Sequence, residues 1–262
     1  MRNKINNLIL GSSGFVGKYL CEYLRNIGEN IVEYDIARSD QEDCRYNKLP
    51  LNNIDRVYFL GWKVGGANYL YDPNTQREQL DWNIKILINT MDQLKHIPFV
   101  FVSTQLVADC DTIYGVLKKL GELWTELNGG RVVRLWNVYG AYEGHSVRSH
   151  VVADFVHQAL NTNEIKMMTK GNEMRQFVYI DDVCEALHKS FEYRGIYDAS
   201  PLVWNTVYDV AKLISENTGC DIIRGEKEGS SVMIKNIQTI CDTKISLDQG
   251  VSRTVELFRK YQ

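Results

Sequence analysis

The stretch "INNLILGSSGFVGKYLCEYLRNIG", residues 5–28, decides the fold class. A short apolar run ends at Gly11, and from Phe15 onward apolar residues recur at the three- and four-residue spacing of a helix. Gly11, Gly14 and Gly17 stand at the turn between the two segments. Glycines at such a turn let backbone N–H groups approach a pyrophosphate at the helix N-terminus, where the helix dipole favours anions. The stretch therefore predicts a βα unit that binds a dinucleotide.

The rest of the first half of the chain repeats this alternation of strand and helix. Further apolar runs are "NIVEYD" (30–35), "RVYFLG" (56–61), "FVFVS" (99–103) and "RVVRLW" (131–136), and helix-like stretches cover residues 75–95 and 114–128. The runs are apolar throughout instead of alternating with polar residues, which is typical of parallel strands covered on both faces. We expect an α/β fold, a Rossmann-type doubly wound parallel sheet with a small C-terminal substrate-binding lobe.

The pattern loosens after Gly140, and the domain division follows from that change. A helix is expected in residues 149–161, a return to the main sheet and its outer helices in 176–192, and an amphipathic helix in 207–219. This order predicts a dinucleotide-binding domain of residues 1–140 plus 177–194, and a substrate-binding lobe of residues 141–176 plus 195–262.

Composition excludes several classes of function. The chain has 262 residues and a formal net charge of -3, with no basic stripe or polybasic segment, so neither nucleic acid nor a membrane surface is an expected partner. The six cysteines show no CxxC spacing, which favours free thiols over a zinc site or a disulfide framework, and no metal is expected. The N-terminus lacks a signal-peptide pattern and no stretch approaches a membrane span, so we expect a cytoplasmic protein.

Asp35 ends the second predicted strand, about twenty residues after the glycines. A carboxylate there accepts hydrogen bonds from the adenosine ribose hydroxyls and repels a 2′-phosphate, which favours NAD over NADP. Arg38, three residues later, could pair with that phosphate, so NADP stays open. The residues expected to bind the cofactor are Gly11, Ser13, Gly14, Phe15, Val16, Gly17, Asp35, Arg38, Leu60, Gly61, Tyr114 and Lys118.

Tyr114 and Lys118 stand four apart in "YGVLKKLGE", residues 114–122. Such a pair is expected about once by chance in this composition, and a second pair, Tyr208 and Lys212, does occur. Spacing alone therefore does not separate a catalytic pair from an accident. Because Tyr208 and Lys212 come after the expected sheet strands, we interpret them as packing and surface residues.

The first pair has a context that the second lacks. The strand "FVFVS" ends in Ser103 and Thr104, and Tyr114 and Lys118 open the next helix. In a parallel sheet these four side chains can meet beside a bound nicotinamide. They are the predicted catalytic residues.

The segments together resemble the extended short-chain dehydrogenase/reductase family, which contains nucleotide-sugar epimerases, dehydratases and ketoreductases. "GSSGFVG", Asp35, Asn83, "VSTQ", "YGVLKKLGE", "RLWNVYG" and "RQFVYIDDV" come in the order of that family. "WKVGGAN" (62–68) and "SHVVADF" (149–155) resemble the GDP-fucose synthase subgroup, and "VST" and "KKLGE" also resemble the dTDP-4-dehydrorhamnose reductase subgroup. The resemblance gives Asn83 a bracing role.

The resemblance implies an acid-base role for Tyr114 on the sugar oxygen. A phenol with a pKa of about 10 is a poor acid-base group at neutral pH, so we expect the Lys118 ammonium to favour the phenolate. Lys118 would also reach the nicotinamide ribose. Ser103 or Thr104 would donate a second hydrogen bond to the sugar oxygen, and the sequence leaves open which of them does.

The resemblance also implies the substrate-binding residues. Asn137 and Arg175 are assigned to the nucleotide-diphosphate end, where a guanidinium suits phosphate. Lys63 and His150 match positions that line the sugar pocket. Gln105 stands where GDP-fucose synthase has a cysteine that acts with the histidine in ring-carbon epimerisation.

Two departures from the family pattern matter. The segment between Ser103 and Tyr114 is shorter than usual, so the roof of the site must be built differently. Gln105 cannot carry a proton at neutral pH, so epimerisation beside the ketone is in doubt unless Cys110 replaces the missing cysteine. Gln105 and Leu106 also follow Thr104 where a dehydratase has an acidic pair, which disfavours that branch.

We interpret the chain as an NAD(P)-dependent reductase of a nucleotide-activated 4-keto sugar, of the kind used in surface-polysaccharide sugar biosynthesis. The alternative is a 4-epimerase that keeps its NAD tightly bound. A third hypothesis is a non-catalytic family member that senses the dinucleotide. The expected partners are a nucleotide-sugar substrate and a second copy of the chain in a homodimer.

Overall fold

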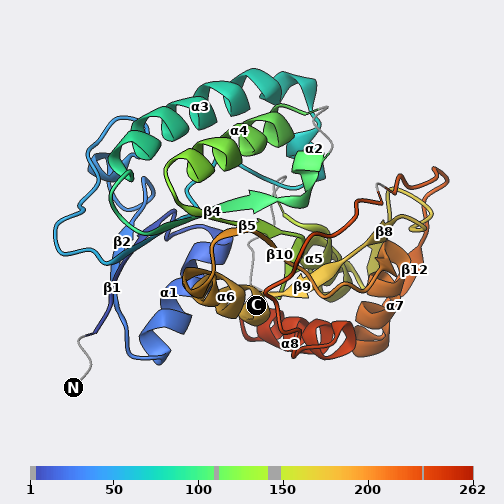
Figure 1. Ribbon diagram of the computed structural model, residues 1–262. Helices are drawn as coiled ribbons and strands as arrows, with labels where there is room; N and C mark the ends of the chain where they lie inside the picture. Colours follow the sequence, from blue (N-terminus) through green and yellow to red (C-terminus); the bar gives the residue numbers. More distant parts are fainter. Residues whose placement is uncertain (1–3, 109–111, 141–148, 232, 262) are drawn as a thin grey trace.

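The computed structural model describes residues 4–108, 112–140, 149–231 and 233–261 (Figure 1). Within them, a parallel sheet runs in the order β10-β5-β4-β3-β1-β2. Its strands are β1 (Asn6–Leu10), β2 (Asn30–Tyr34), β3 (Arg56–Phe59), β4 (Phe99–Thr104), β5 (Arg131–Leu135) and β10 (Gly195–Ala199). This confirms the expected Rossmann-type fold.

Helices cover both faces of the sheet (Figure 1). On one side lie α3 (Gln76–Gln93) and α4 (Ile113–Leu127), and on the other α1 (Phe15–Asn26) and α6 (Ile180–Lys189). Along β4, Phe99 and Phe101 belong to one buried cluster, whereas Val100 and Val102 belong to the other. Because successive side chains of a strand point to opposite faces, an unbroken apolar run supplies both layers of the core.

The second lobe packs against the end of the sheet. Its helices are α5 (Val151–Thr162), α7 (Val207–Thr218) and α8 (Leu247–Lys260), and its two-stranded sheets pair β7 (Glu164–Lys166) with β12 (Asp221–Ile223) and β8 (Met174–Arg175) with β11 (Asn205–Thr206). The short elements are α2 (Ala67–Leu70), η1 (Asp40–Glu42), η2 (Pro73–Thr75), η3 (Gln105–Ala108) and η4 (Ser190–Glu192). One hydrophobic cluster runs from the sheet into this lobe.

Two details correct the expected division of the chain. β10 pairs with β5 at the edge of the main sheet, although residues from 195 onward were assigned to the lobe. β9 (Phe177–Tyr179) pairs with β6 (Asn137–Tyr139) in a separate two-stranded sheet, although a return to the main sheet was expected there. Both pairings join segments far apart in the sequence, so local pattern does not reveal them.

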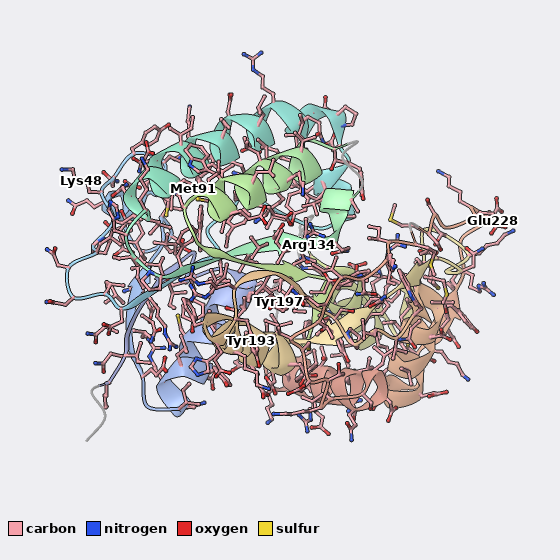
Figure 2. The ribbon with its side chains drawn as sticks, in the orientation of Figure 1. Lys48, Met91, Arg134, Tyr193, Tyr197 and Glu228 are labelled. Atoms are coloured by element: carbon pink, nitrogen blue, oxygen red, sulfur yellow. The ribbon has the colours of Figure 1, made fainter. Side chains whose placement is uncertain are left out.

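The surface carries charged side chains around this core (Figure 2). Lys48 and Glu228 project at opposite ends of the view, whereas Met91 of α3 is fully buried against the sheet. No helix among the described residues combines the length and apolar character needed to span a bilayer.

Candidate active site

A cavity of about 860 Å³ opens at the carboxyl ends of the parallel strands. Gly11 and Asp35 line it just beyond β1 and β2, Leu60 and Gly61 just beyond β3, and Thr104 at the end of β4. Residues of the lobe form its other wall. Open α/β sheets bind ligands at this edge.

The glycines of the first turn fit a dinucleotide. Gly11 has a φ of +86°, and a Cβ there would lie 2.6 Å from the backbone nitrogen of Gly61. A Cβ on Gly17 would overlap the carbonyl oxygen of Gly11, so this glycine lets α1 pack closely against the turn. Gly14 is the N-cap of α1 and supplies no side-chain cap, so the first N–H groups of the helix remain for an anion at the cavity.

Asp35 is held at the cavity wall. Its Oδ2 accepts a 3.0 Å hydrogen bond from the backbone N–H of Ser13, and its Oδ1 accepts a 2.8 Å bond from that of Ala37. Arg38 instead pairs with Glu33 at 2.8 Å and with Glu42 at 3.4 Å. The expected cofactor-binding residues line the cavity with two exceptions, Ser13 and Arg38.

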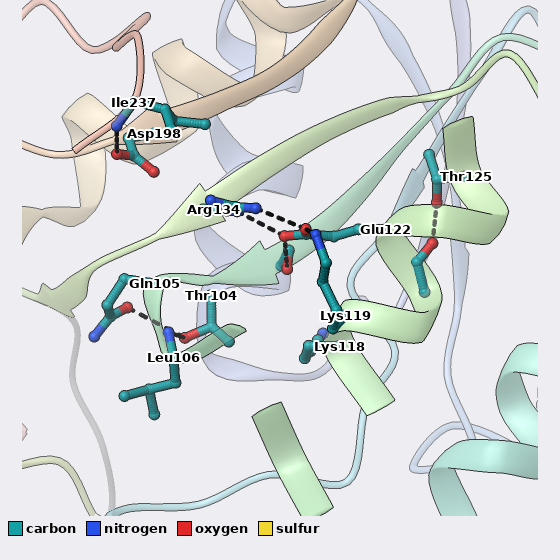
Figure 3. A network of polar contacts seen from close by, with 12 residues as sticks. Thr104, Gln105, Leu106, Lys118, Lys119, Glu122, Thr125, Arg134, Asp198 and Ile237 are labelled. Atoms are coloured by element: carbon teal, nitrogen blue, oxygen red, sulfur yellow. Dashed lines mark hydrogen bonds and ion pairs between the residues drawn. The ribbon is translucent and has the colours of Figure 1, made fainter. Parts of the chain in front are cut away.

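Tyr114 lies in the first turn of α4, which Thr112 caps by accepting a 3.0 Å hydrogen bond from Gly115 N–H. Tyr114 hydrogen-bonds Thr104, and Thr104 Oγ1 donates to Gln105 Oε1 at 3.2 Å (Figure 3 shows Thr104 and Gln105). Burial raises the pKa of Tyr114 to about 12, and the hydrogen bond with Thr104 opposes this rise. Tyr114 and Thr104 therefore form a paired phenol and hydroxyl at the cavity.

Lys118 lies one turn further along the helix and is only 3% exposed. Its Nζ donates a 2.6 Å hydrogen bond to the carbonyl of Val102. Burial lowers the pKa of the Lys118 ammonium well below its usual value, and Glu122 opposes this shift. The expected lowering of the Tyr114 pKa is not observed, because burial of the phenol outweighs the opposing hydrogen bond.

Ser103 points to the opposite side of β4 from Thr104. Its Oγ donates a 2.7 Å hydrogen bond to Oε1 of Glu122, which also receives the Arg134 guanidinium at 2.7 and 2.8 Å (Figure 3). Side-chain alternation along the strand separates the two hydroxyls. Both residues contribute to the cavity lining. Of the two candidates that the sequence left open, Thr104 is the one joined to Tyr114, whereas the Ser103 hydroxyl is bonded within a buried network.

The five predicted substrate-binding residues, Lys63, Gln105, Asn137, His150 and Arg175, all line the cavity. The backbone of Lys63 is fixed by Asn83, whose Oδ1 accepts from its N–H at 2.8 Å and whose Nδ2 donates to its carbonyl at 3.1 Å. Asn83 is fully buried, so it braces the loop after β3. Lys63 Nζ pairs with Glu78 at 2.9 Å.

The other substrate-binding candidates lie on the lobe side. Asn137 donates to the carbonyl of Gln176 from its backbone and its side chain, at 3.1 and 3.2 Å. Arg175 donates to carbonyls at 2.8 and 3.0 Å and has no acidic partner among the described side chains. The ring of His150, the N-cap of α5, stacks on Phe15 with centroids 5.3 Å apart.

Sequence reasoning missed the aromatic lining of the cavity. Trp62, Tyr71, Trp82, Trp136 and Trp204 all contribute to the wall. Trp62 directly follows one predicted strand and Trp136 ends another, and this position at a strand end was the signal that could have identified them. The rings of Trp136 and Trp204 meet edge to face with centroids 5.6 Å apart.

The structure also places the second tyrosine-lysine pair and the cysteines. Tyr208 and Lys212 lie on α7 outside the cavity, and Lys212 pairs with Glu216 at 3.7 Å. Five cysteines, Cys21, Cys44, Cys184, Cys220 and Cys241, are free and buried, whereas Cys110 lies outside the described residues. Across residues 4–108, 112–140, 149–231 and 233–261, no cluster of three or more His, Cys, Asp or Glu side chains could hold a metal ion.

Residues 113–199, from the start of α4 to the end of β10, match the sequence model of the NAD dependent epimerase/dehydratase family. The chain is similar to UDP-glucuronic acid decarboxylase 1 of Arabidopsis thaliana, with 21% identity, covering 98% of this chain and 71% of that protein. The match covers 52% of UDP-glucuronic acid decarboxylase 1 of Danio rerio and 83% of CDP-abequose synthase of Yersinia pseudotuberculosis.

Solved structures show the same fold. UDP-glucose 4-epimerase of Thermotoga maritima with UDP-glucose superposes with a TM-score of 0.83 and 21% identity, covering 98% of this chain and 99% of that one. UDP-glucuronic acid 4-epimerase of Bacillus cereus, in complex with UDP-glucuronic acid and NAD, gives a TM-score of 0.77 and 19% identity, covering 98% of this chain and 100% of that one. These likenesses establish the fold.

Proposed function

We propose that this protein is an NAD-dependent enzyme that transfers hydride at carbon 4 of a nucleotide-activated sugar. The observation that carries the proposal is the hydrogen bond between Tyr114 and Thr104 at the wall of a dinucleotide-type cavity. Tyr114 exchanges the proton of the sugar oxygen. Thr104, whose single hydroxyl proton is donated to Gln105 in this structure, would turn that proton to the same oxygen as its charge changes. Bound NAD would supply or accept the hydride.

The proposal of NAD over NADP is supported by two side chains. Asp35 lines the cavity with its carboxylate oriented by two backbone N–H groups, where it would accept bonds from ribose hydroxyls. Arg38 is engaged by Glu33 and Glu42 and does not line the cavity. The description of the matched family as NAD dependent agrees with this choice.

The other end of the cavity suits a sugar bound to a diphosphate. Arg175 presents a guanidinium whose described partners are backbone carbonyls, and Lys63 and Asn137 also line the cavity. Arg is suited to bidentate contact with phosphate. The similar epimerases of known structure carry UDP-glucose or UDP-glucuronic acid, which supports a nucleotide sugar as the substrate here.

Within this chemistry we propose a reductase of a 4-keto sugar, with a 4-epimerase as the second candidate. The reductase is supported by the segments at 62–68 and 149–155, which resemble the GDP-fucose synthase subgroup. Gln105, which accepts a hydrogen bond from Thr104, argues against inversion at carbons 3 and 5 and does not separate the two candidates. The epimerase is favoured by the similar 4-epimerases of known structure.

One experiment separates the two candidates. The purified protein is denatured, released NAD is quantified, and fresh protein is given NADH with a panel of nucleotide 4-keto sugars. NADH consumption identifies the reductase, whereas stoichiometric retained NAD with interconversion of 4-epimers identifies the epimerase. Protein that neither retains NAD nor binds NADH contradicts the proposed function.

A further inference from the structure

Lys118 is a buried lysine, and the acid one turn further along its helix is already engaged. Glu122, one turn along α4, accepts hydrogen bonds from Ser103 and Arg134. Among the described side chains, no carboxylate lies within 4.0 Å of Lys118 Nζ, although Lys119 makes such a contact with Glu122 at 3.4 Å. A buried ammonium ordinarily requires a partner for its charge.

The partner that the structure provides is aromatic. Lys118 Nζ lies 3.9 Å from the centroid of the Trp62 ring and 4.7 Å from that of Phe101. The indole face is the strongest aromatic acceptor for a cation, and the attraction is effective within about 6 Å of the centroid. A neutral amine gains little from this contact, so the ring favours the charged state of the lysine.

Packing fixes the orientation of Trp62. Its ring meets Phe101 edge to face, with centroids 5.8 Å apart and an interplanar angle of 69°. Its indole nitrogen is buried and has no hydrogen-bond partner in the described structure. Contacts with Phe101 and Lys118, instead of a polar anchor, therefore hold the indole in the cavity wall.

We propose that Trp62 is a positioning residue that holds the Lys118 ammonium in its charged form against the carbonyl of Val102, beside Tyr114. The inference rests on the proposed function, which gives Lys118 its role at the nicotinamide ribose and next to the phenol. In this arrangement the indole face replaces the carboxylate that would otherwise stabilise a buried lysine. Trp62 thereby connects the loop after β3 to the acid-base pair on α4.

The other charged and titratable groups of this site come from α4, from β5 and from the turn after α2. Tyr114 and Glu122 lie on the same helix as Lys118. Burial lowers the pKa of Lys118, and the charge of Glu122 opposes this lowering. Arg134 of β5 pairs with Glu122 and offsets its charge. Tyr71, beyond α2, lies on the cavity wall and affects Tyr114 electrostatically.

The test follows Lys118 itself. Protein labelled with ¹³C-lysine is titrated with pH by NMR, and the Lys118 ε-methylene signal is assigned with Lys118→Arg. In Trp62→Leu we expect the titration midpoint to fall by about one pH unit relative to the wild type, the size of a desolvated cation–π contact. Trp62→Phe should restore part of the shift, because a phenyl face binds a cation more weakly than an indole face.

The matched control is Trp124→Leu, which removes an indole from the same helix as Lys118 and from outside the cavity. It should leave the midpoint unchanged. A wild-type midpoint in Trp62→Leu would overturn the proposal. If Trp62→Leu does not fold, the Lys118 midpoint of Trp62→Phe is used instead. The proposal requires this midpoint to lie below that of the wild type, and an unchanged midpoint contradicts it.

NADH binding, measured by fluorescence on the same proteins, keeps the two proposals apart. A wild-type protein that does not bind NADH contradicts the proposed function. The NMR titration uses no cofactor and no sugar, so its result decides the role of Trp62 in either case.

Discussion

The hydroxyl of Ser103 donates a 2.7 Å hydrogen bond to Oε1 of Glu122, a carboxylate with no exposed area. The adjacent residue, Thr104, hydrogen-bonds Tyr114 at the cavity. Two neighbouring hydroxyls thus serve opposite sides of β4. The Ser103 hydroxyl connects β4 to α4, and the Thr104 hydroxyl bonds Tyr114 and Gln105 at the cavity.

This division gives the first prediction. Thr104→Ala should reduce turnover by about 10²-fold or more, the loss typical of removing an oxyanion donor, with little change in stability. Ser103→Ala should instead lower the free energy of unfolding by about 1–2 kcal/mol, because a buried carboxylate loses a donor. Denaturant unfolding and the assay for the proposed reaction measure the two effects. The reverse pattern would assign catalysis to Ser103.

Tyr114→Phe should leave folding and NADH binding intact. Its turnover should fall by about 10²-fold or more, because the general acid-base is lost. Tyr208→Phe is the matched control, since it removes a hydroxyl from the second tyrosine-lysine pair on α7, and it should retain wild-type turnover. Equal activity of Tyr114→Phe and the wild type would refute the site.

Asp35→Ala should weaken NADH binding and increase the relative affinity for NADPH, because repulsion of the 2′-phosphate is lost. Fluorescence titration with both cofactors measures the ratio of dissociation constants. Arg38→Ala should leave that ratio nearly unchanged, since Arg38 pairs with Glu33 and Glu42 away from the cavity. A wild-type protein that strongly prefers NADPH would contradict the role given to Asp35.

Gln105 leads to a prediction about stereochemistry. Inversion of a carbon beside the ketone needs two side chains that exchange protons, and an amide cannot do so. We expect reaction in deuterium oxide to leave carbons 3 and 5 of the product without deuterium, as measured by mass spectrometry. Deuterium at carbon 3 or 5 that appears with the wild type and is lost in Cys110→Ser would show that Cys110 exchanges protons at those carbons.

We propose that the expected homodimer forms through α3 and α4. Their exposed apolar side chains are Leu80, Ile88, Val116, Leu120, Leu123 and Leu127, the last of them 85% exposed. Adjacent exposed apolar side chains of this kind mark association sites. Leu123→Asp should convert the dimer to monomer in sedimentation velocity, whereas Leu202→Asp, which changes an exposed leucine outside the helices, should not. A monomeric wild type would refute the surface.

The sequence by itself determined the strand-turn-helix of residues 5–28 and the parallel sheet, and it identified polar and charged residues of the cavity but not its aromatic lining. Those features depend on local requirements: Gly17 must lack a Cβ, and β4 must be apolar on both faces. They are therefore visible in residue type and spacing.

Tertiary structure alone decided which side chains of the site contact one another. The way α4 packs on β4 decides that Ser103 meets Glu122 and that Thr104 meets Tyr114. The contact between Lys118 and Trp62 joins α4 to the loop after β3. The placement of β10 beside β5 likewise depends on a long-range pairing. Such contacts are set by packing between distant segments, for which residue spacing along the chain carries no signal.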